Sequence, residues 1–211
     1  MSNNLPNKTR EWYTRHMPPD LQFIIDLTHK YRSIDRDMYY PDSDRPENDA
    51  EHTFQIAMVA WHIIETKKLS LDQTKVFKLC LAHDLVEIYS GDVPLWGSSQ
   101  TMHNEKAERE HQALFKLKDK FAPNTEVTSA IEEYKARTTE EAKFVYALDK
   151  LIPYTNQIFI EGKVWKNHGI QLQQVIDIHL KHALVSPHLS QYFYDIIELL
   201  KKDPEKYFGK V

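Results

Sequence analysis

Two stretches of the chain, residues 50–67 and 71–88, carry apolar side chains around most of a helical turn. In the first stretch these residues recur at helical spacing, at Phe54, Ile56, Ala57, Val59, Ala60, Ile63 and Ile64. A helix that is apolar over so much of its surface is typical of a protein interior, so both stretches predict central, buried helices. Only five glycines occur in 211 residues, too few for a turn-rich β architecture. The predicted fold class is therefore all-α.

The same periodicity predicts further helices over residues 20–33, 103–120, 125–136, 170–183 and 187–202. Another helix opens at residues 138–141 with side chains typical of a capping arrangement, and its apolar face predicts that it continues through Pro153 with a kink. Residues 33–48 lack any periodicity and predict a long structured loop. No segment shows the alternation that is typical of a strand.

The length of the chain favours one domain, because single cores usually divide only above about 250 residues. We expect that domain over residues 20–202, with an N-terminal extension over 1–19 and a C-terminal tail over 203–211. The formal net charge of −4 argues against nonspecific binding to nucleic acid. The sequence has one cysteine, no signal-peptide pattern and no apolar run of membrane-spanning length. We therefore expect a cytoplasmic protein without a nucleic-acid or membrane partner.

Ligand-type side chains interrupt the apolar helices at three places. His83 and Asp84 lie near the end of the second apolar stretch, and His52 begins the first. Asp149 lies in the apolar part of the helix that opens near residue 138. Charged side chains are almost never fully buried unless they are paired or bind a metal. Two imidazoles and two carboxylates suit a divalent ion such as manganese, cobalt, iron or zinc better than calcium.

Each of these residues also has an ordinary structural interpretation when it is taken alone. His52 fits a cap at the start of a helix, Asp84 fits an ion pair with Lys78, and Asp149 fits a bridge to a nearby lysine. Their occurrence together on three buried helices favours a metal site. On a continuous helix Glu87 would lie four positions from His83, so its carboxylate would point into the same cavity.

The pattern H…HD…D resembles that of the HD-domain phosphohydrolases. The strings RPENDAEHT, AHDLVEIYSGDVP and TTEEAKFVYALDK resemble in particular the branch of the bacterial 5′-deoxynucleotidases and the eukaryotic HD-domain-containing protein 2. The resemblance covers about residues 21–154. It implies the all-helical HD-domain bundle, a homodimer and one divalent transition metal, with Mn, Co, Fe or Zn expected before Mg. The implied ligands are His52, His83, Asp84 and Asp149.

The resemblance also implies roles for residues around the metal. It implies that Glu87 orients or activates the attacking water, and that Asp92 contacts the sugar and assists the reaction. It further implies that Arg36 and Arg45 hold the phosphate, and the planar donors of arginine suit that role. Without the resemblance, both arginines would be interpreted as ordinary solvated charges of the predicted loop.

One position departs from the pattern of this branch. The bacterial enzymes carry a tryptophan directly after the arginine that matches Arg36, and here that residue is Asp37. A carboxylate at this place can accept a hydrogen bond from a ribose hydroxyl. We therefore expect Asp37 to contact the substrate and discrimination against ribonucleotides to be weak.

The expected activity is metal-dependent removal of the 5′-phosphate from (deoxy)nucleoside 5′-monophosphates. An HD-type (deoxy)nucleoside triphosphate triphosphohydrolase is the first alternative, because the HD core does not distinguish the two substrates. A noncatalytic nucleotide-binding HD module is the second. Such modules often lose a metal ligand or the glutamate after the HD pair, and this chain retains all of them.

Overall fold

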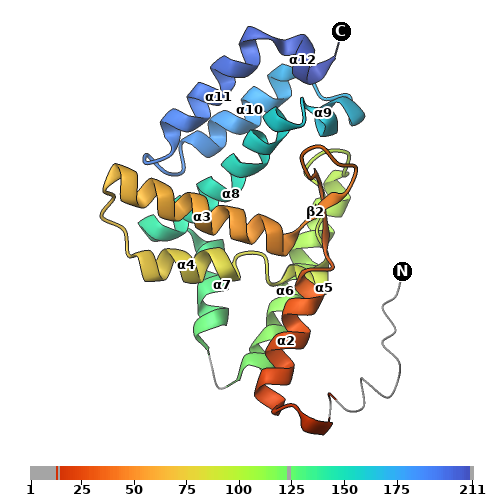
Figure 1. The fold of residues 1–211 in the computed structure, drawn as a ribbon, viewed down its shortest axis with the longest axis vertical. Helices are drawn as coiled ribbons and strands as arrows, with labels where there is room; N and C mark the ends of the chain where they lie inside the picture. Colours follow the sequence, from red (N-terminus) through yellow and green to blue (C-terminus); the bar gives the residue numbers. More distant parts are fainter. Residues whose placement is uncertain (1–12, 14, 123–124, 210–211) are drawn as a thin grey trace.

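The computed structural model describes Tyr13 and residues 15–122 and 125–209. Its fold is a bundle of α-helices with one small sheet, which confirms the predicted all-α class (Figure 1). In chain order the helices are α2 (Pro19–Tyr31), α3 (Asp49–Lys67), α4 (Gln73–Ala82), α5 (Glu87–Ser90), α6 (Gln100–Phe121), α7 (Glu126–Ala136), α8 (Glu140–Phe159), α9 (Lys163–Asn167), α10 (Leu172–Ala183), α11 (Ser190–Lys202) and α12 (Pro204–Phe208). Among the described residues, no helix is both long enough and apolar enough to pass through a lipid bilayer.

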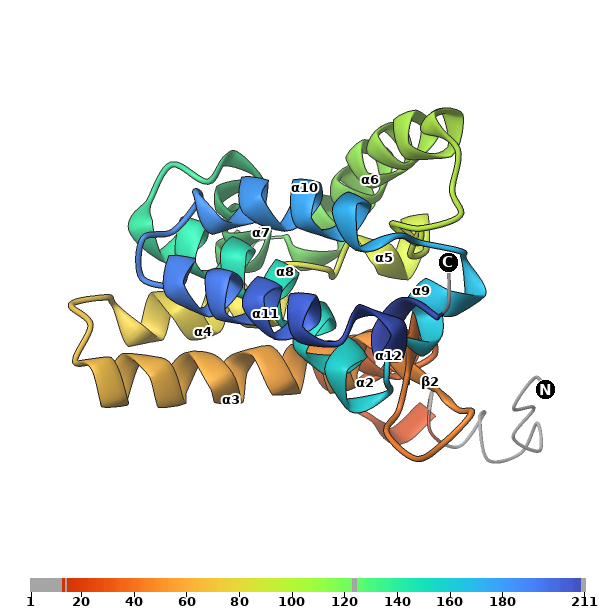
Figure 2. The same cartoon turned by 90° about the horizontal axis from the view of Figure 1, so that it is seen from above.

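Helix α8 is the centre of the bundle. It contacts α3, α4 and α7 on one side and α10 and α11 on the other, as Figures 1 and 2 show. The side chains of Phe144, Val145, Ala147 and Leu148 have no solvent-exposed surface, as the wide apolar face predicts. The helix continues through Pro153 as predicted. Proline has no amide hydrogen, so one helical bond, to the carbonyl of Asp149, is missing.

The sequence-based prediction of a loop over residues 33–48 is wrong. Strands β1 (Asp35–Tyr39) and β2 (Pro46–Asn48) form an antiparallel hairpin between α2 and α3. The strands are short, and their buried side chains are Met38 and the carboxylate Glu47. An apolar/polar alternation does not arise when a polar side chain occupies the interior face, so the period-2 signal was absent.

The predicted helix over residues 71–88 is also corrected. Helix α4 ends at Ala82, residues 83–86 form a turn, and the short helix α5 follows. Within the turn the amide of Leu85 donates to the carbonyl of Ala82 at 3.2 Å. This bond joins residues three positions apart, as in a 3₁₀ turn, whereas an α-helix joins residues four positions apart. The apolar pattern alone could not reveal this break, because it accompanies a hydrogen bond between the His83 side chain and the Cys80 carbonyl.

A capping box fixes the start of α3. The Asn48 side chain accepts hydrogen bonds from the amides of Ala50 and Glu51, each at 3.1 Å. The Glu51 carboxylate accepts one from the Asn48 amide at 3.1 Å. Three otherwise unpaired amides at the helix start are thereby satisfied, and His52 is held in the first turn of α3.

The C-terminal residues carry two short helices that the periodicity did not predict, α9 and α12. Phe208 stacks on the buried Trp165 with ring centres 5.0 Å apart, and Tyr207 is buried. The segment after residue 202, expected as a tail, therefore includes a helix packed against the bundle. Gly162 sits between α8 and α9 at φ +71°, directly against the backbone of Tyr207.

We predict that Gly162→Ala lowers the free energy of unfolding by at least about 2 kcal/mol. An added Cβ would overlap the carbonyl oxygen of Tyr207, and the left-handed backbone already disfavours any side chain. Gly169 is the matched control, because its φ is +62° but a Cβ there would meet open space. Urea denaturation of Gly169→Ala should show only the smaller backbone cost. Equal losses in both variants would contradict the proposed steric role of Tyr207.

Candidate metal centre and its pocket

His52 and Asp149 meet in the interior of the bundle, although 97 positions separate them in the sequence. His52 lies in the first turn of α3 and Asp149 in the middle of α8, and both are buried. His52 Nε2 and Asp149 Oδ1 are 3.0 Å apart. The other oxygen of Asp149 accepts a hydrogen bond from the Tyr134 hydroxyl at 2.6 Å and pairs with Lys150 at 2.8 Å. These contacts fix the carboxylate and direct Oδ1 toward His52.

His83 reaches the same point from the turn after α4. Its Nδ1 lies 2.7 Å from the carbonyl of Cys80, which can only accept, so Nδ1 carries the hydrogen. A continuing helix would use that carbonyl for the amide of Asp84, and this side-chain bond accompanies the end of α4. His83 Nε2 lies 3.0 Å from Asp84 Oδ2 and 4.0 Å from Asp149 Oδ1. The imidazole is thus held with Nε2 facing both carboxylates.

The structure brings together all four residues that the sequence analysis selected as metal ligands. One nitrogen or oxygen atom from each of His52, His83, Asp84 and Asp149 lies within 4.8 Å of the others. Two nitrogens and two oxygens form a donor set that fits a divalent transition metal. The residues present therefore fit the metal that the sequence pattern implies.

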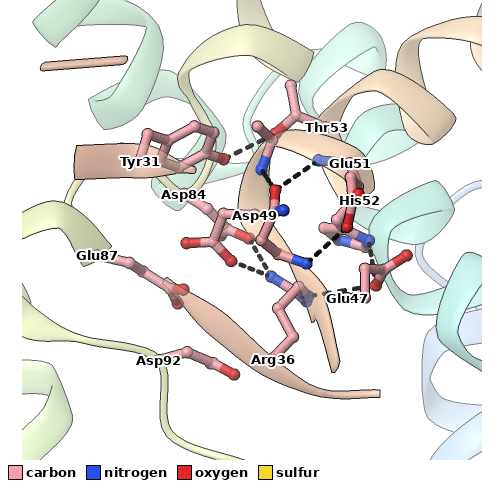
Figure 3. Close-up of polar contacts among 12 residues, drawn as sticks. Tyr31, Arg36, Glu47, Asp49, Glu51, His52, Thr53, Asp84, Glu87 and Asp92 are labelled. Carbon is pink, nitrogen blue, oxygen red and sulfur yellow. Dashed lines mark hydrogen bonds and ion pairs between the residues drawn. The ribbon is translucent and has the colours of Figure 1, made fainter. Parts of the chain in front are cut away.

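Arg36 from β1 lies at the centre of a group of carboxylates (Figure 3). Its Nη1 donates to Asp49 Oδ1 and to Asp84 Oδ2, both at 3.0 Å, and its Nε is 3.7 Å from Glu47. Burial alone would raise the pKa of Asp84, but the charges of His83 and Arg36 outweigh it and hold that pKa below its usual value. His83 and Arg36 together therefore keep this partly buried carboxylate ionised.

The charge of Arg36 also affects His52. Burial, together with the nearby Arg36 cation, lowers the pKa of His52 to about 4. The imidazole is therefore neutral near pH 7, and neutral imidazole is the form that binds a metal. Burial raises the pKa of Glu47, whose carboxylate lies 3.8 Å from His52 Nδ1, to about 7.

Glu87 and Asp92 approach the site from the segment after the turn (Figure 3). The prediction that Glu87 shares a helix with His83 is wrong, because Glu87 begins the separate helix α5. Its carboxylate still lies close to those of Asp49 and Asp84. Lys106 from α6 donates to Glu87 Oε1 at 3.0 Å and lies 3.4 Å from Asp92 Oδ1. Burial, with Asp84 and Asp92 nearby, raises the pKa of Glu87, and Lys106 opposes that rise.

A pocket of about 500 Å³ opens beside the candidate ligands. Tyr146, Tyr154, Trp96 and Trp165 contribute aromatic wall. Asp37 also lines the pocket, and its carboxylate lies 2.8 Å from His168 Nε2. The charged lining residues are seven acidic and five basic ones, namely Asp37, Glu47, Asp84, Glu87, Asp92, Glu110, Asp149, Arg36, Lys106, Lys135, Arg137 and Lys150.

Comparison with known proteins identifies the family. The family model described as an HD domain matches residues 28–187, which is more than half of the chain. The chain belongs to the HD-domain family. This confirms the resemblance that the H…HD…D pattern carries, and it agrees with the four candidate ligands lying together.

Relatives of this HD-domain chain include named enzymes and a solved structure. The chain is 33% identical to the 5′-deoxynucleotidase HDDC2 of Xenopus laevis over 113 residues, and 29% identical to that of Homo sapiens over 113 residues. It spans about half the length of these curated relatives, and the match covers 53% of the chain. A structure described as a predicted metal-dependent phosphohydrolase from Magnetospirillum magnetotacticum MS-1 matches with a TM-score of 0.77 and 30% identity, over 90% of this chain and 94% of that one.

Among the predicted substrate contacts, Arg45 is the one that the HD-domain fold does not bring to the pocket. Its guanidinium forms two hydrogen bonds with Glu51, at 2.9 and 3.0 Å, and lies over the Tyr40 ring. About half of its side chain is exposed, and it does not line the pocket. Sequence reasoning also missed Lys106, because the high charge of its helix indicated an exposed face. No local signal distinguishes this lysine from its neighbours on α6.

We predict that Lys106→Met lowers the free energy of unfolding by about 1–3 kcal/mol at neutral pH, since the buried Glu87 loses its charged partner. The pKa of Glu87 is raised to about 10 in the folded state, so the stability of wild type falls as pH rises from the unfolded pKa toward that value. Removing Lys106 raises this pKa further, so the deficit relative to wild type should be the same at pH 5 and pH 8 and larger at about pH 10. The control is Lys120→Met, an exposed position on the same helix. A deficit that does not change with pH would contradict this role.

Proposed function

We propose that this chain is a metal-dependent phosphohydrolase that removes the 5′-phosphate from nucleoside 5′-monophosphates. One observation carries the proposal: two buried imidazoles and two carboxylates converge at the wall of a pocket large enough for a nucleotide. The printed names of the relatives, 5′-deoxynucleotidase and metal-dependent phosphohydrolase, support the same chemistry.

The ligands we propose are His52, His83, Asp84 and Asp149. A divalent ion bound there would lower the pKa of a water molecule and polarise a phosphoryl oxygen. The protein supplies the orientation of the ligands. The Cys80 carbonyl fixes the tautomer of His83, while Tyr134 and Lys150 fix Asp149. Mutation of groups that hydrogen-bond to metal ligands commonly lowers metal affinity or activity by about 10- to 100-fold.

Glu87 is the residue we assign to the attacking water. Its Oε1 is held by Lys106, and its Oε2 has no hydrogen-bond partner among the described residues. Burial raises the pKa of this carboxyl, which favours a group that accepts a proton from water and returns it to the leaving oxygen. The side chain lines the same pocket as three of the candidate ligands, His83, Asp84 and Asp149.

The charge of the pocket supports metal dependence. Of the five basic side chains in the lining, Arg36, Lys106, Lys135 and Lys150 are each paired with a carboxylate, so little free positive charge is left for a dianionic phosphate. A bound divalent cation would supply it. We also propose that Asp92 and Asp37 face the sugar, because both line the pocket and neither belongs to the ligand group. Asp37 can accept a hydrogen bond from a ribose 2′-hydroxyl, which would weaken discrimination against ribonucleotides.

A substrate panel tests the function. The purified protein is supplied in turn with Mn, Co, Fe, Zn and Mg, and phosphate release is measured with dAMP, AMP and dATP. The proposal expects free orthophosphate from the monophosphates. Release of intact triphosphate from dATP would instead identify a triphosphohydrolase, and binding without turnover would identify a noncatalytic module.

We predict that Asp84→Ala loses both the metal and the activity. The substitution removes one ligand and also leaves His83 and Arg36 without their shared carboxylate. Elemental analysis of the purified variant should find less than one ion per chain. Asp92→Ala is the matched control, because it removes a pocket carboxylate outside the ligand group and should retain the metal. A fully metallated and active Asp84→Ala would overturn the ligand assignment.

We predict that Glu87→Gln retains the metal and loses about 10²- to 10⁴-fold in kcat, the usual contribution of a general acid or base. The amide keeps the size of the side chain but does not accept the proton from water. Metal content and kcat are measured on the same preparation. Loss of the metal would make Glu87 a ligand, and near-normal turnover would contradict its proposed role.

A further inference from the structure

Arg137 is a pocket-lining cation without an acidic partner. It caps the end of α7, its side chain is exposed, and it forms no ion pair with any described residue. Its guanidinium carbon lies 4.5 Å from the centre of the Tyr146 ring. The other four lining cations are each paired with a carboxylate, namely Arg36 with Asp84, Lys106 with Glu87, Lys135 with Glu110, and Lys150 with Asp149.

A second cation lies on the same aromatic ring. The Lys150 ammonium is 5.4 Å from the centre of Tyr146 and 2.8 Å from Asp149 Oδ2. Tyr146, Asp149 and Lys150 fall three and four positions apart on α8, so they share one face of that helix. Arg137, Tyr146 and Lys150 therefore form a continuous piece of pocket wall that adjoins a candidate metal ligand.

The part of the pocket wall formed by Arg137, Tyr146 and Lys150 is positively charged and solvent-accessible, as an anion-binding site requires. Lys150 is neutralised by Asp149, and a divalent ion bound to Asp149 would draw on the same negative charge. Two cations near one ring would then lack a full counter-charge. Both are accessible, since 37% of the Lys150 side chain is exposed and Arg137 is exposed, whereas only 14% of the Arg36 side chain is. Arg36 is already surrounded by three carboxylates.

We propose that Arg137 and Lys150 form a phosphate-binding face beside the metal centre, and that Arg137, not Arg45, is the second arginine that contacts phosphate oxygens of the substrate. The inference rests on the proposed function for the identity of the substrate. The planar donors of a guanidinium suit phosphate oxygens, and stacking on Tyr146 orients them. The phosphate contacted is either the one cleaved or the next one in a longer chain.

The backbone of Arg137 supplies a clean test. Its φ is +51°, in the left-handed region that favours glycine, and Lys68 ends α3 with a φ of +52°. Lys68 is exposed and does not line the pocket. Arg137→Gly and Lys68→Gly therefore relieve the same backbone constraint, and neither variant should have a lower Tm than wild type. Only Arg137→Gly removes the proposed phosphate contact.

The probes are orthophosphate and pyrophosphate, titrated calorimetrically into the manganese-loaded full chain. We expect Arg137→Gly to weaken binding about tenfold or more, as for loss of a charge-assisted hydrogen bond, and Lys68→Gly to leave it unchanged. Arg137→Gln, which keeps a long side chain, should show the same loss. Weakening of both anions places the contact at the phosphate beside the metal, and weakening of pyrophosphate alone places it at the next phosphate.

Unchanged affinity for both anions in Arg137→Gly and Arg137→Gln would overturn the inference. The binding readout separates this result from failure of the proposed function. A chain that hydrolyses no nucleotide but loses phosphate affinity through Arg137 would refute the nucleotidase activity and retain the anion site. A chain that hydrolyses dAMP while both Arg137 variants keep wild-type affinity for orthophosphate and pyrophosphate would retain the nucleotidase activity and refute the anion site.

Discussion

The need to neutralise buried carboxylates dominates the interior of this protein. Asp49 and Asp149 are buried and Asp84 is partly buried, and an unpaired charge in such a place costs several kcal/mol. Arg36 supplies the permanent positive charge, bonded to two of the three, while Lys150 serves the third. A divalent ion would complete the balance. The charged centre thus depends on cations brought from separate elements, and the surrounding helices are arranged to deliver them.

The architecture delivers these groups from rigid positions. The capping box sets His52 in the first turn of α3, and α8 carries Asp149 on the helix that the rest of the bundle surrounds. The turn after α4 presents His83 through its bond to the Cys80 carbonyl. The β1–β2 hairpin inserts Arg36 between them. Helices and a hairpin hold such a group more tightly than free loops do, and tight placement is what metal and phosphate chemistry requires.

Most helices and all four candidate ligands could be predicted from the sequence, because apolar periodicity is a local signal and charged residues within it stand out. The break after Ala82 could not, since it accompanies a side-chain bond from His83 to a main-chain carbonyl. The hairpin was missed because its buried positions include Glu47, which gives no apolar alternation. The local sequence also does not indicate which arginine side chain faces the pocket. Arg45 and Arg137 look alike in sequence, and only packing separates them.

Because Arg45 pairs with Glu51, substitutions at Arg45 would affect activity without removing a substrate contact. Glu51 belongs to the capping box of α3, so Arg45 fastens the hairpin to the start of the helix that carries His52. A defect at Arg45 would thus be transmitted as a small displacement of an imidazole. Activity measurements alone would rank it among substrate contacts, whereas its true signature would be altered metal retention with unaltered phosphate affinity. Arg45 lies outside the pocket, and its contact with Glu51 joins the β1–β2 hairpin to the start of α3.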